Sequence, residues 1–200
     1  MSQRVDKEEV WRRLGTPHGY ILAVFTGDMR ENFAVVPHIY DRLVQAGLPQ
    51  SLVVAGVREG ERVLVESALS RYAWRQRVVI VPFLPAGREQ ELAELYAAAL
   101  AYVDPSLHEG FGMQVIEAMA CGTPVVCSDR GALPEVAGDA AVLVDPEDPA
   151  GIAEAVVRVF EDRGLRERLV ARGEERAASF TWERTARVIR EGLMQVAGGF

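Results

Sequence analysis

The sequence predicts a doubly wound α/β domain in which helices cover both faces of a parallel sheet. Short apolar runs recur along the chain, and segments with the apolar spacing of helices lie between them. The first run, YILAVFT at residues 20–26, shows no polar alternation, which is typical of a strand buried on both faces. Strands that alternate with helices favour right-handed crossovers and therefore parallel pairing.

The chain length fits one domain over residues 1–200. With 200 residues, of which 49% are hydrophobic, the chain can bury a full core. No internal repeat, low-complexity tract or linker divides the sequence. We therefore expect a single α/β domain that carries a helical C-terminal extension.

The N-terminal segment begins with a short helix that Asp6 can cap and that Gly15 ends. After the first strand, a second helix runs to Gly47. Pro37 lies near the start of that helix, where a missing N–H costs least, so the helix can begin later than Phe33. The elements predicted next are a strand at 51–57, a helix at 62–73, a strand at 77–83, a helix at 88–99 and a strand at 100–105.

The central segment contains a short helix that begins near Gly112 or Met113 and ends at Cys121. Gly122 is suited to the left-handed stop of this helix, and Pro124 follows just beyond. The last two strands are predicted at residues 124–128 and 140–145.

The C-terminal third is helical in its apolar spacing. Asp148 followed by Pro149 is typical of a cap and first helical position, so a helix should run to about residue 160. A second helix is predicted at residues 165–178, and Thr181 can cap a last helix that starts at Trp182.

Charge and composition exclude several classes of function. The formal net charge of −7 and the absence of a Lys/Arg run argue against a nucleic-acid groove. The N-terminus has no apolar signal region and no apolar run is long enough to span a membrane, so we expect a cytoplasmic protein. Cys121 and Cys127 lie in apolar surroundings without metal-ligand spacing and are expected to be buried thiols.

Ligands of such a sheet bind beyond the carboxyl ends of the strands, where the strand order reverses. One of the loops at that edge carries the sequence HEGFG, followed by a helix, with Glu109 before the glycines and Glu117 inside the helix. The glycines let backbone N–H groups approach a ligand, and the helix N-terminus favours an anion. The two carboxylates suit vicinal hydroxyls, as in sugars and ribose.

Each of these residues also has a plainer interpretation. A lone loop glutamate is usually solvated and a helix glutamate usually lies on the surface, but the joint pattern with the glycines favours a ligand role for Glu109 and Glu117. A single histidine such as His108 more often satisfies a local hydrogen bond than it catalyses. Arg30 and Arg58 are loop arginines for which a surface role and an anion-binding role are about equally expected.

The segment PSLHEGFGMQVIEAMACGTPVVCSDRGALPEVAGDAAVLVDPEDP at residues 105–149 closely resembles the E-x7-E region of retaining, nucleotide-sugar-dependent glycosyltransferases. These enzymes have the GT-B fold, which consists of two Rossmann-like domains, and belong to the large family 4 group. A weaker similarity extends over residues 78–106 and 169–189. The pattern E-x7-E is weak alone, but together with both glycines, EAMACGTPVV and LPEV it is specific.

The resemblance implies roles for individual residues. Glu109 is similar to the glutamate that contacts the hydroxyls of the donor sugar, and Glu117 to the one that holds the ribose of the nucleotide. Backbone groups of the adjacent turn would meet the donor sugar and diphosphate, and the end of the third strand would meet the nucleobase. The residues implied are Gly110, Phe111, Gly112 and Met113 for the donor sugar and diphosphate, and Val81, Pro82 and Phe83 for the base.

The sequence departs from the family pattern in two places. The resemblance covers only the C-terminal, donor-binding domain. With about twenty residues before the first strand, we expect the 200 residues not to include the N-terminal acceptor domain. Relatives carry a basic pair after the first strand, whereas this chain has TGDMREN, with Asp28 where an arginine is common and Glu31 where a lysine is common. Arg30, with Arg58 on the next loop, remains to bind the diphosphate.

Two functional hypotheses follow. The first is the donor domain of a retaining glycosyltransferase that takes a UDP- or GDP-sugar without a metal or other cofactor and needs the absent N-terminal domain for transfer. The second is a non-catalytic sugar-nucleotide-binding or interaction module, an isolated half that needs a partner domain. A nicotinamide-dependent dehydrogenase is disfavoured because TGDMREN is not G-x-G-x-x-G. No residue is predicted as the catalytic base, and the apolar edge facing the absent domain is expected to allow self-association.

Overall fold

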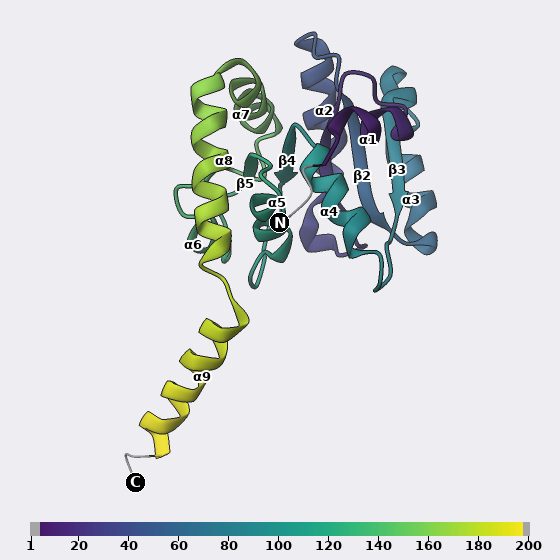
Figure 1. Cartoon of the computed structure of the whole chain (residues 1–200). Helices are drawn as coiled ribbons and strands as arrows, with labels where there is room; N and C mark the ends of the chain where they lie inside the picture. The colour runs from purple at the N-terminus through teal and green to yellow at the C-terminus, as the bar shows by residue number, and fades with distance from the viewer. Residues whose placement is uncertain (1–4, 198–200) are drawn as a thin grey trace.

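The computed structural model describes residues 5–197 and confirms the predicted doubly wound α/β fold (Figure 1). Six parallel strands form one sheet in the order β3-β2-β1-β4-β5-β6. The strands are β1 (Tyr20–Val24), β2 (Ser51–Val57), β3 (Val78–Pro82), β4 (Ala101–Asp104), β5 (Val125–Ser128) and β6 (Ala141–Val144). The order reverses between β1 and β4, so the loops after these two strands flank the predicted ligand crevice.

The helices cover both faces of the sheet. They are α1 (Lys7–Leu14), α2 (Val36–Gln45), α3 (Glu59–Leu69), α4 (Glu89–Ala98), α5 (Met113–Ala120), α6 (Leu133–Ala137), α7 (Pro149–Glu161), α8 (Arg163–Ala178) and α9 (Trp182–Ala197). Short 3₁₀ turns add η1 (Met29–Glu31), η2 (Phe33–Val35) and η3 (Ala73–Arg77).

Two separate apolar clusters form the core because successive strand residues point to opposite faces. On one face, Ile21 of β1 packs with side chains of α2, α3 and α7. On the other face, Leu22 of the same strand packs with α1, α4, α5 and α6. Both residues are almost fully buried, which explains why the strand shows no polar alternation in the sequence.

Local capping signals place several helix ends as predicted. The carboxylate of Asp6 accepts the N–H groups of Glu8 and Glu9, and Gly15 ends α1 with a left-handed φ of 71°. Asp148 accepts the N–H of Ala150 at the start of α7. Such caps depend on neighbouring residues alone, so the sequence predicts them well.

The structure corrects two helices. The short helix α6 was not predicted, because five residues with Pro134 near the start give no apolar period. Helix α3 begins at Glu59 rather than at residue 62, since the side chain of Glu61 accepts the N–H of Arg58 at 2.9 Å and closes the first turn.

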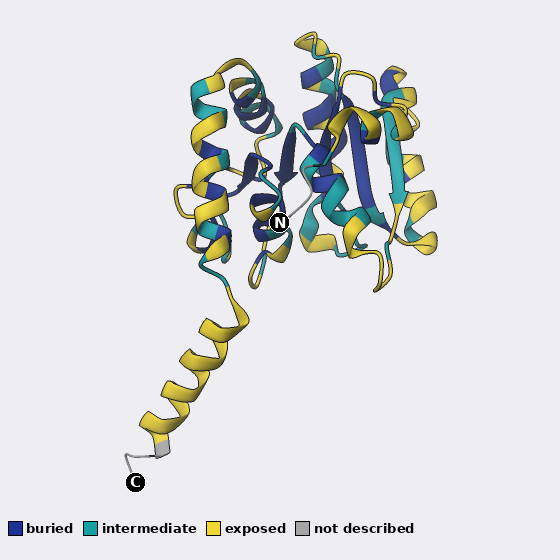
Figure 2. Cartoon of the chain, in the orientation of Figure 1, coloured by how far each residue is buried: buried dark blue, intermediate teal, exposed yellow. Residues whose placement is uncertain are grey.

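The last helix, α9, extends away from the α/β body (Figure 1) and is exposed along its described length (Figure 2). Its start at Trp182 matches the prediction, and Thr181 accepts the N–H of Arg184 at 3.1 Å. Within residues 5–197, no helix is long and apolar enough to cross a membrane.

Candidate functional site

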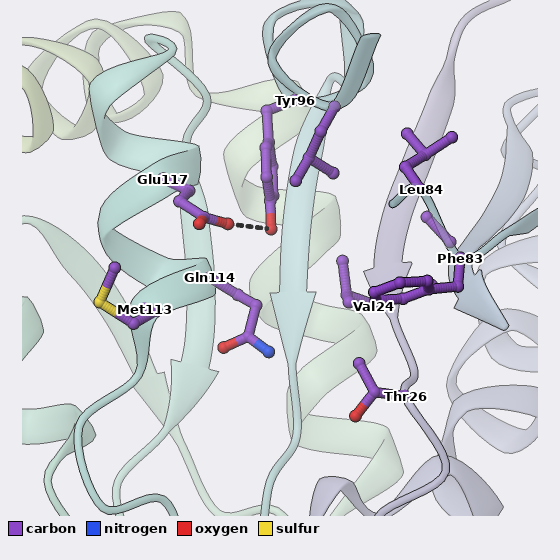
Figure 3. A pocket seen from close by; sticks show the side chains of 11 residues that line it. Val24, Thr26, Phe83, Leu84, Tyr96, Met113, Gln114 and Glu117 are labelled. Carbon is purple, nitrogen blue, oxygen red and sulfur yellow. Dashed lines mark hydrogen bonds between the residues drawn. The ribbon is translucent and has the colours of Figure 1, made fainter. Parts of the chain in front are cut away.

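A pocket of about 180 Å³ opens at the carboxyl edge of the sheet, beside the reversal of strand order (Figure 3). Its walls come from the ends of β1 and β2, the segment after β3, and helices α4 and α5. The lining residues are Val24, Thr26, Ala55, Gly56, Phe83, Leu84, Leu92, Tyr96, Met113, Gln114 and Glu117. The walls are mostly apolar, so a flat ring system can be buried there beside a single carboxylate.

Glu117 supplies that carboxylate from the second turn of α5. The hydroxyl of Tyr96, on α4, donates to its Oε2 at 3.1 Å, as Figure 3 shows. Burial raises the pKa of Glu117, and the Tyr96 hydrogen bond opposes that shift. One oxygen of the carboxylate thus accepts from Tyr96, while the other has no hydrogen-bond partner in the described residues and can accept from hydroxyl groups of a ligand in the pocket that Glu117 lines.

Glu109 lies outside the pocket, on the loop between β4 and α5. Its Oε1 is 3.5 Å from the hydroxyl of Ser106, which donates to the buried Asp104 at 2.6 Å. Burial raises the pKa of Glu109, and the negative charge of Asp104 adds to the shift. The backbone of Glu109 is fixed from the other side, because its carbonyl accepts the N–H of Ala132 at 3.0 Å.

The turn between the two glutamates presents a row of backbone donors. Within the described residues, the N–H groups of residues 110–114 donate to no acceptor. Gly112 has a φ of 93°, and a Cβ there would lie 2.4 Å from Leu133 Cδ2, so only glycine fits. The ring of Phe111 packs against the ring of Phe180, with the two ring centroids 5.7 Å apart. The backbone of this turn is therefore free to meet an anion at the helix N-terminus.

Arg58 spans the rim of the pocket. Its Nη1 donates to the carbonyl of Thr26 at 3.0 Å, and its guanidinium lies 5.1 Å from the ring centroid of Phe83. Phe83 lines the pocket and remains 46% exposed, so part of its ring is accessible to a ligand. Val81 and Pro82 do not line this pocket, and of the predicted base wall only Phe83 does.

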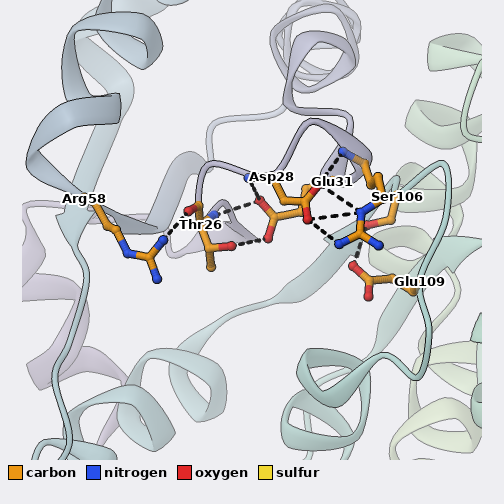
Figure 4. Close-up of polar contacts among 7 residues, drawn as sticks. Thr26, Asp28, Glu31, Arg58, Ser106 and Glu109 are labelled. Atoms are coloured by element: carbon orange, nitrogen blue, oxygen red, sulfur yellow. Dashed lines mark hydrogen bonds and ion pairs between the residues drawn. The ribbon is translucent and has the colours of Figure 1, made fainter.

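Arg30 is engaged by a carboxylate of its own turn. Asp28 accepts from Arg30 Nη2 at 2.5 Å and from Nε at 3.1 Å, and this pairing lowers the pKa of Asp28 to about 2. The neighbouring carboxylate of Glu31 accepts two hydrogen bonds from Thr26, one from its N–H at 2.8 Å and one from its hydroxyl at 2.6 Å (Figure 4). Of the two predicted diphosphate cations, Arg58 has no carboxylate partner in the described chain, whereas Arg30 does.

The structure adds residues that the sequence analysis missed. Tyr96 and Gln114 line the pocket, and the buried Asp104 holds Ser106 beneath Glu109. Gln114 adjoins a predicted donor residue and could have been included by position. Tyr96 lies on another helix, and no local pattern signals its contact with Glu117.

The edge around these loops carries exposed apolar side chains, as predicted. They are Met29, Phe83, Leu107, Phe111 and Met113.

Across residues 5–197, no group of three or more His, Cys, Asp or Glu side chains is placed to hold a metal ion. The arrangement offers an apolar slot, two carboxylates for hydroxyl groups, and backbone donors with one arginine for an anion.

Comparison with known proteins assigns the chain to a family. The model for glycosyl transferases group 1 matches residues 6–176. An O-antigen chain mannosyltransferase B of Escherichia coli is 35% identical over 166 residues, which are 82% of this chain and 43% of that protein. A D-inositol 3-phosphate glycosyltransferase of Salinispora arenicola is 36% identical over 199 residues, 94% of this chain and 43% of that protein. The chain therefore spans less than half the length of these relatives.

Solved structures share the fold. Sucrose-phosphate synthase from Thermosynechococcus elongatus has a TM-score of 0.79 at 28% identity, over 96% of this chain and 49% of that one. Anabaena HepE, solved in complex with UDP-glucose, has a TM-score of 0.82 at 19% identity, over 97% of this chain and 54% of that one. With the matching family model over most of its length, this chain belongs to the glycosyl transferases group 1 family.

Proposed function

We propose that this chain is the donor-binding domain of a retaining glycosyltransferase, which takes a nucleoside diphosphate sugar for transfer to an acceptor hydroxyl. The observation that carries the proposal is the row of unpaired N–H groups at residues 110–114, between Glu109 and the pocket that contains Glu117. This order of an apolar slot, a hydroxyl acceptor, anion donors and a second carboxylate matches the order of base, ribose, diphosphate and sugar in such a donor.

Each part of the donor then has a binding group. The base lies in the slot beside Phe83, and Glu117 accepts hydrogen bonds from the ribose hydroxyls. The diphosphate meets the N-terminus of α5 and Arg58, and Glu109 accepts from the sugar. Binding of UDP-glucose by the structural relative HepE supports a nucleotide sugar as the ligand, with a UDP- or GDP-sugar as the class.

The chemical contribution of this domain is to stabilise the leaving group. As the bond to the sugar breaks, negative charge accumulates on the departing diphosphate. Backbone donors already directed at that position stabilise the charge without reorganising, and Arg58 adds a positive charge. We propose that no metal ion is needed, and we assign no catalytic base within this chain.

Acceptor contacts are proposed to lie on a second, N-terminal domain, since this chain matches less than half of the curated relatives. The chain alone should accordingly bind the donor and show at most slow hydrolysis of it. Isothermal titration calorimetry with UDP, GDP and ADP, each with and without EDTA, tests the binding. No measurable binding of any nucleoside diphosphate, or binding that EDTA abolishes, would contradict the proposal.

A second candidate is a non-catalytic sugar-nucleotide-binding or interaction module. The ion pair between Asp28 and Arg30 favours it, because this pair removes one cation from the diphosphate edge. Chromatography of UDP-glucose or GDP-mannose incubated with the chain separates the two candidates. Release of free sugar above the buffer rate supports the enzyme domain, whereas tight binding that protects the donor from hydrolysis supports the binding module.

A further inference from the structure

The loop after β1 neutralises its own cation. Asp28 caps the turn η1 by accepting the N–H of Arg30 at 2.9 Å. The same carboxylate accepts from the Arg30 side chain at two nitrogens, so the guanidinium is held in a two-pronged ion pair within its own turn. The side chain of Arg30 is otherwise largely open to water. Within the described residues Asp28 is its ion-pair partner, and the more distant carboxylates of Glu109 and Glu31 add a weaker attraction.

The neighbouring carboxylate occupies the other donors of this loop. Glu31 accepts the N–H of Thr26 at 2.8 Å, the hydroxyl of Thr26 at 2.6 Å and the N–H of Asp28 at 3.3 Å (Figure 4). These donors lie directly beyond the carboxyl end of β1, on one side of the crevice. An anion in the crevice therefore finds them already bonded to an internal carboxylate.

The loop is fixed against the other side of the crevice. The carbonyl of Arg30 accepts the N–H of Leu107 at 2.7 Å, and the side-chain amide of Asn32 donates to the carbonyls of Pro105 and Pro146 at 3.1 and 3.0 Å. Arg30 thus lies next to the loop that carries Glu109 and leads into the turn at residues 110–114, which is proposed to bind the diphosphate. Its position suits a diphosphate contact, but its charge is compensated by Asp28.

We propose that Asp28 limits donor affinity, because its ion pair with Arg30 keeps this guanidinium from binding the diphosphate. The inference rests on the proposed nucleotide-sugar function. It requires that Arg30 contribute little in the native chain and become a diphosphate ligand once the charge of residue 28 is removed. A residue that merely capped the turn would show neither effect.

The test is a double-mutant cycle read by calorimetry, with inorganic pyrophosphate, UDP and GDP as probes. Asp28→Asn keeps a side-chain oxygen to cap the turn but removes the charge. We expect it to bind pyrophosphate and the preferred nucleotide about fivefold more tightly, the upper end of what an exposed charge pair supplies. Arg30→Gln alone should change the affinity little, and Asp28→Asn with Arg30→Gln should lose the gain.

A matched control removes the same charge elsewhere. Glu167→Gln frees Arg163 on α8, where the two side chains form an exposed ion pair at 2.7 Å, and should leave the affinity unchanged. The inference is overturned if Asp28→Asn shows no gain, if the gain persists without Arg30, or if Glu167→Gln shows it too. Failure of every variant to prefer a nucleotide over pyrophosphate refutes the nucleotide function instead, and pyrophosphate alone then decides the role of Asp28.

Discussion

Replacing Glu117 should separate a role in ligand binding from a role in packing. Glu117→Ala removes the proposed acceptor for the ribose hydroxyls and also the acceptor of the Tyr96 hydroxyl at 3.1 Å. Loss of a hydrogen bond to a charged group costs about 1.5–3 kcal/mol, which corresponds to a 10- to 150-fold weaker affinity for UDP or GDP. Nucleotide and nucleotide sugar should be weakened alike, because both contain the ribose.

The same substitution should lower stability, since Tyr96 is only 1% exposed and its hydroxyl loses its partner. An unsatisfied buried polar group costs about 1–3 kcal/mol, or roughly 2 to 12 °C in melting temperature for a chain of this size. Glu117→Gln keeps an oxygen for Tyr96 and should melt within about 2 °C of the native chain while still weakening nucleotide binding.

Glu109→Gln completes the comparison. Glu109 lies outside the pocket, so this variant should bind plain nucleotide normally and weaken only the sugar-bearing donor. Calorimetry with UDP against UDP-glucose and GDP against GDP-mannose, together with thermal melts, measures both effects. Glu154→Gln on the exposed surface of α7 serves as the control. Equal losses for both ligands at Glu109, or a lower melting temperature without a binding defect at Glu117, would refute the assignment.

Three further predictions concern the support of the site. Gly131→Ala should weaken nucleotide-sugar binding in calorimetry, because the φ of Gly131 is 62° and an added Cβ would lie 2.8 Å from the carbonyl oxygen of Glu109. Gly15→Ala is the control: Gly15 has a φ of 71°, but an added Cβ would meet open space, so binding should not change. Equal effects of the two variants on binding would contradict this prediction. Burial raises the pKa of Asp104 above its ordinary 3.8, so at pH values between 3.8 and this raised pKa the folded state keeps a proton that the unfolded state has lost. The free energy of unfolding therefore falls as the pH rises through this range. Denaturant titrations from about pH 4 to about pH 7 should therefore show Asp104→Asn gaining stability relative to the native chain with rising pH, whereas a flat difference would exclude this burial cost. Light scattering at high concentration should show self-association through the exposed apolar edge that includes Met29 and Phe111, reduced by nucleotide sugar, and a strict monomer would argue against it.

Local signals in the sequence were enough for most of the fold. The unbroken apolar run at β1 predicts a strand covered on both faces, and Asp6 and Gly15 bound the first helix through contacts within a few residues. The pattern around Glu109 and Glu117 predicts a ligand loop because glycines and a helix N-terminus act through the adjacent backbone.

The sequence alone also predicted at which edge of the sheet a ligand site would lie, since this expectation follows from the alternation of strands and helices. It did not give the strand order, which depends on how the crossovers pack. Only the folded chain shows that the order reverses between β1 and β4 and that the loops after these strands face each other.

The tertiary structure decided the state of each site residue through contacts between distant segments. Tyr96 reaches Glu117 from another helix, and Ala132 holds the backbone of Glu109. Arg30 and Arg58 look alike in the sequence, yet the first pairs with Asp28 while the second lies over Phe83 at the pocket rim. The sequence determines which side chains carry a charge. Whether that charge is available to a ligand depends on which partners the fold brings within hydrogen-bond distance.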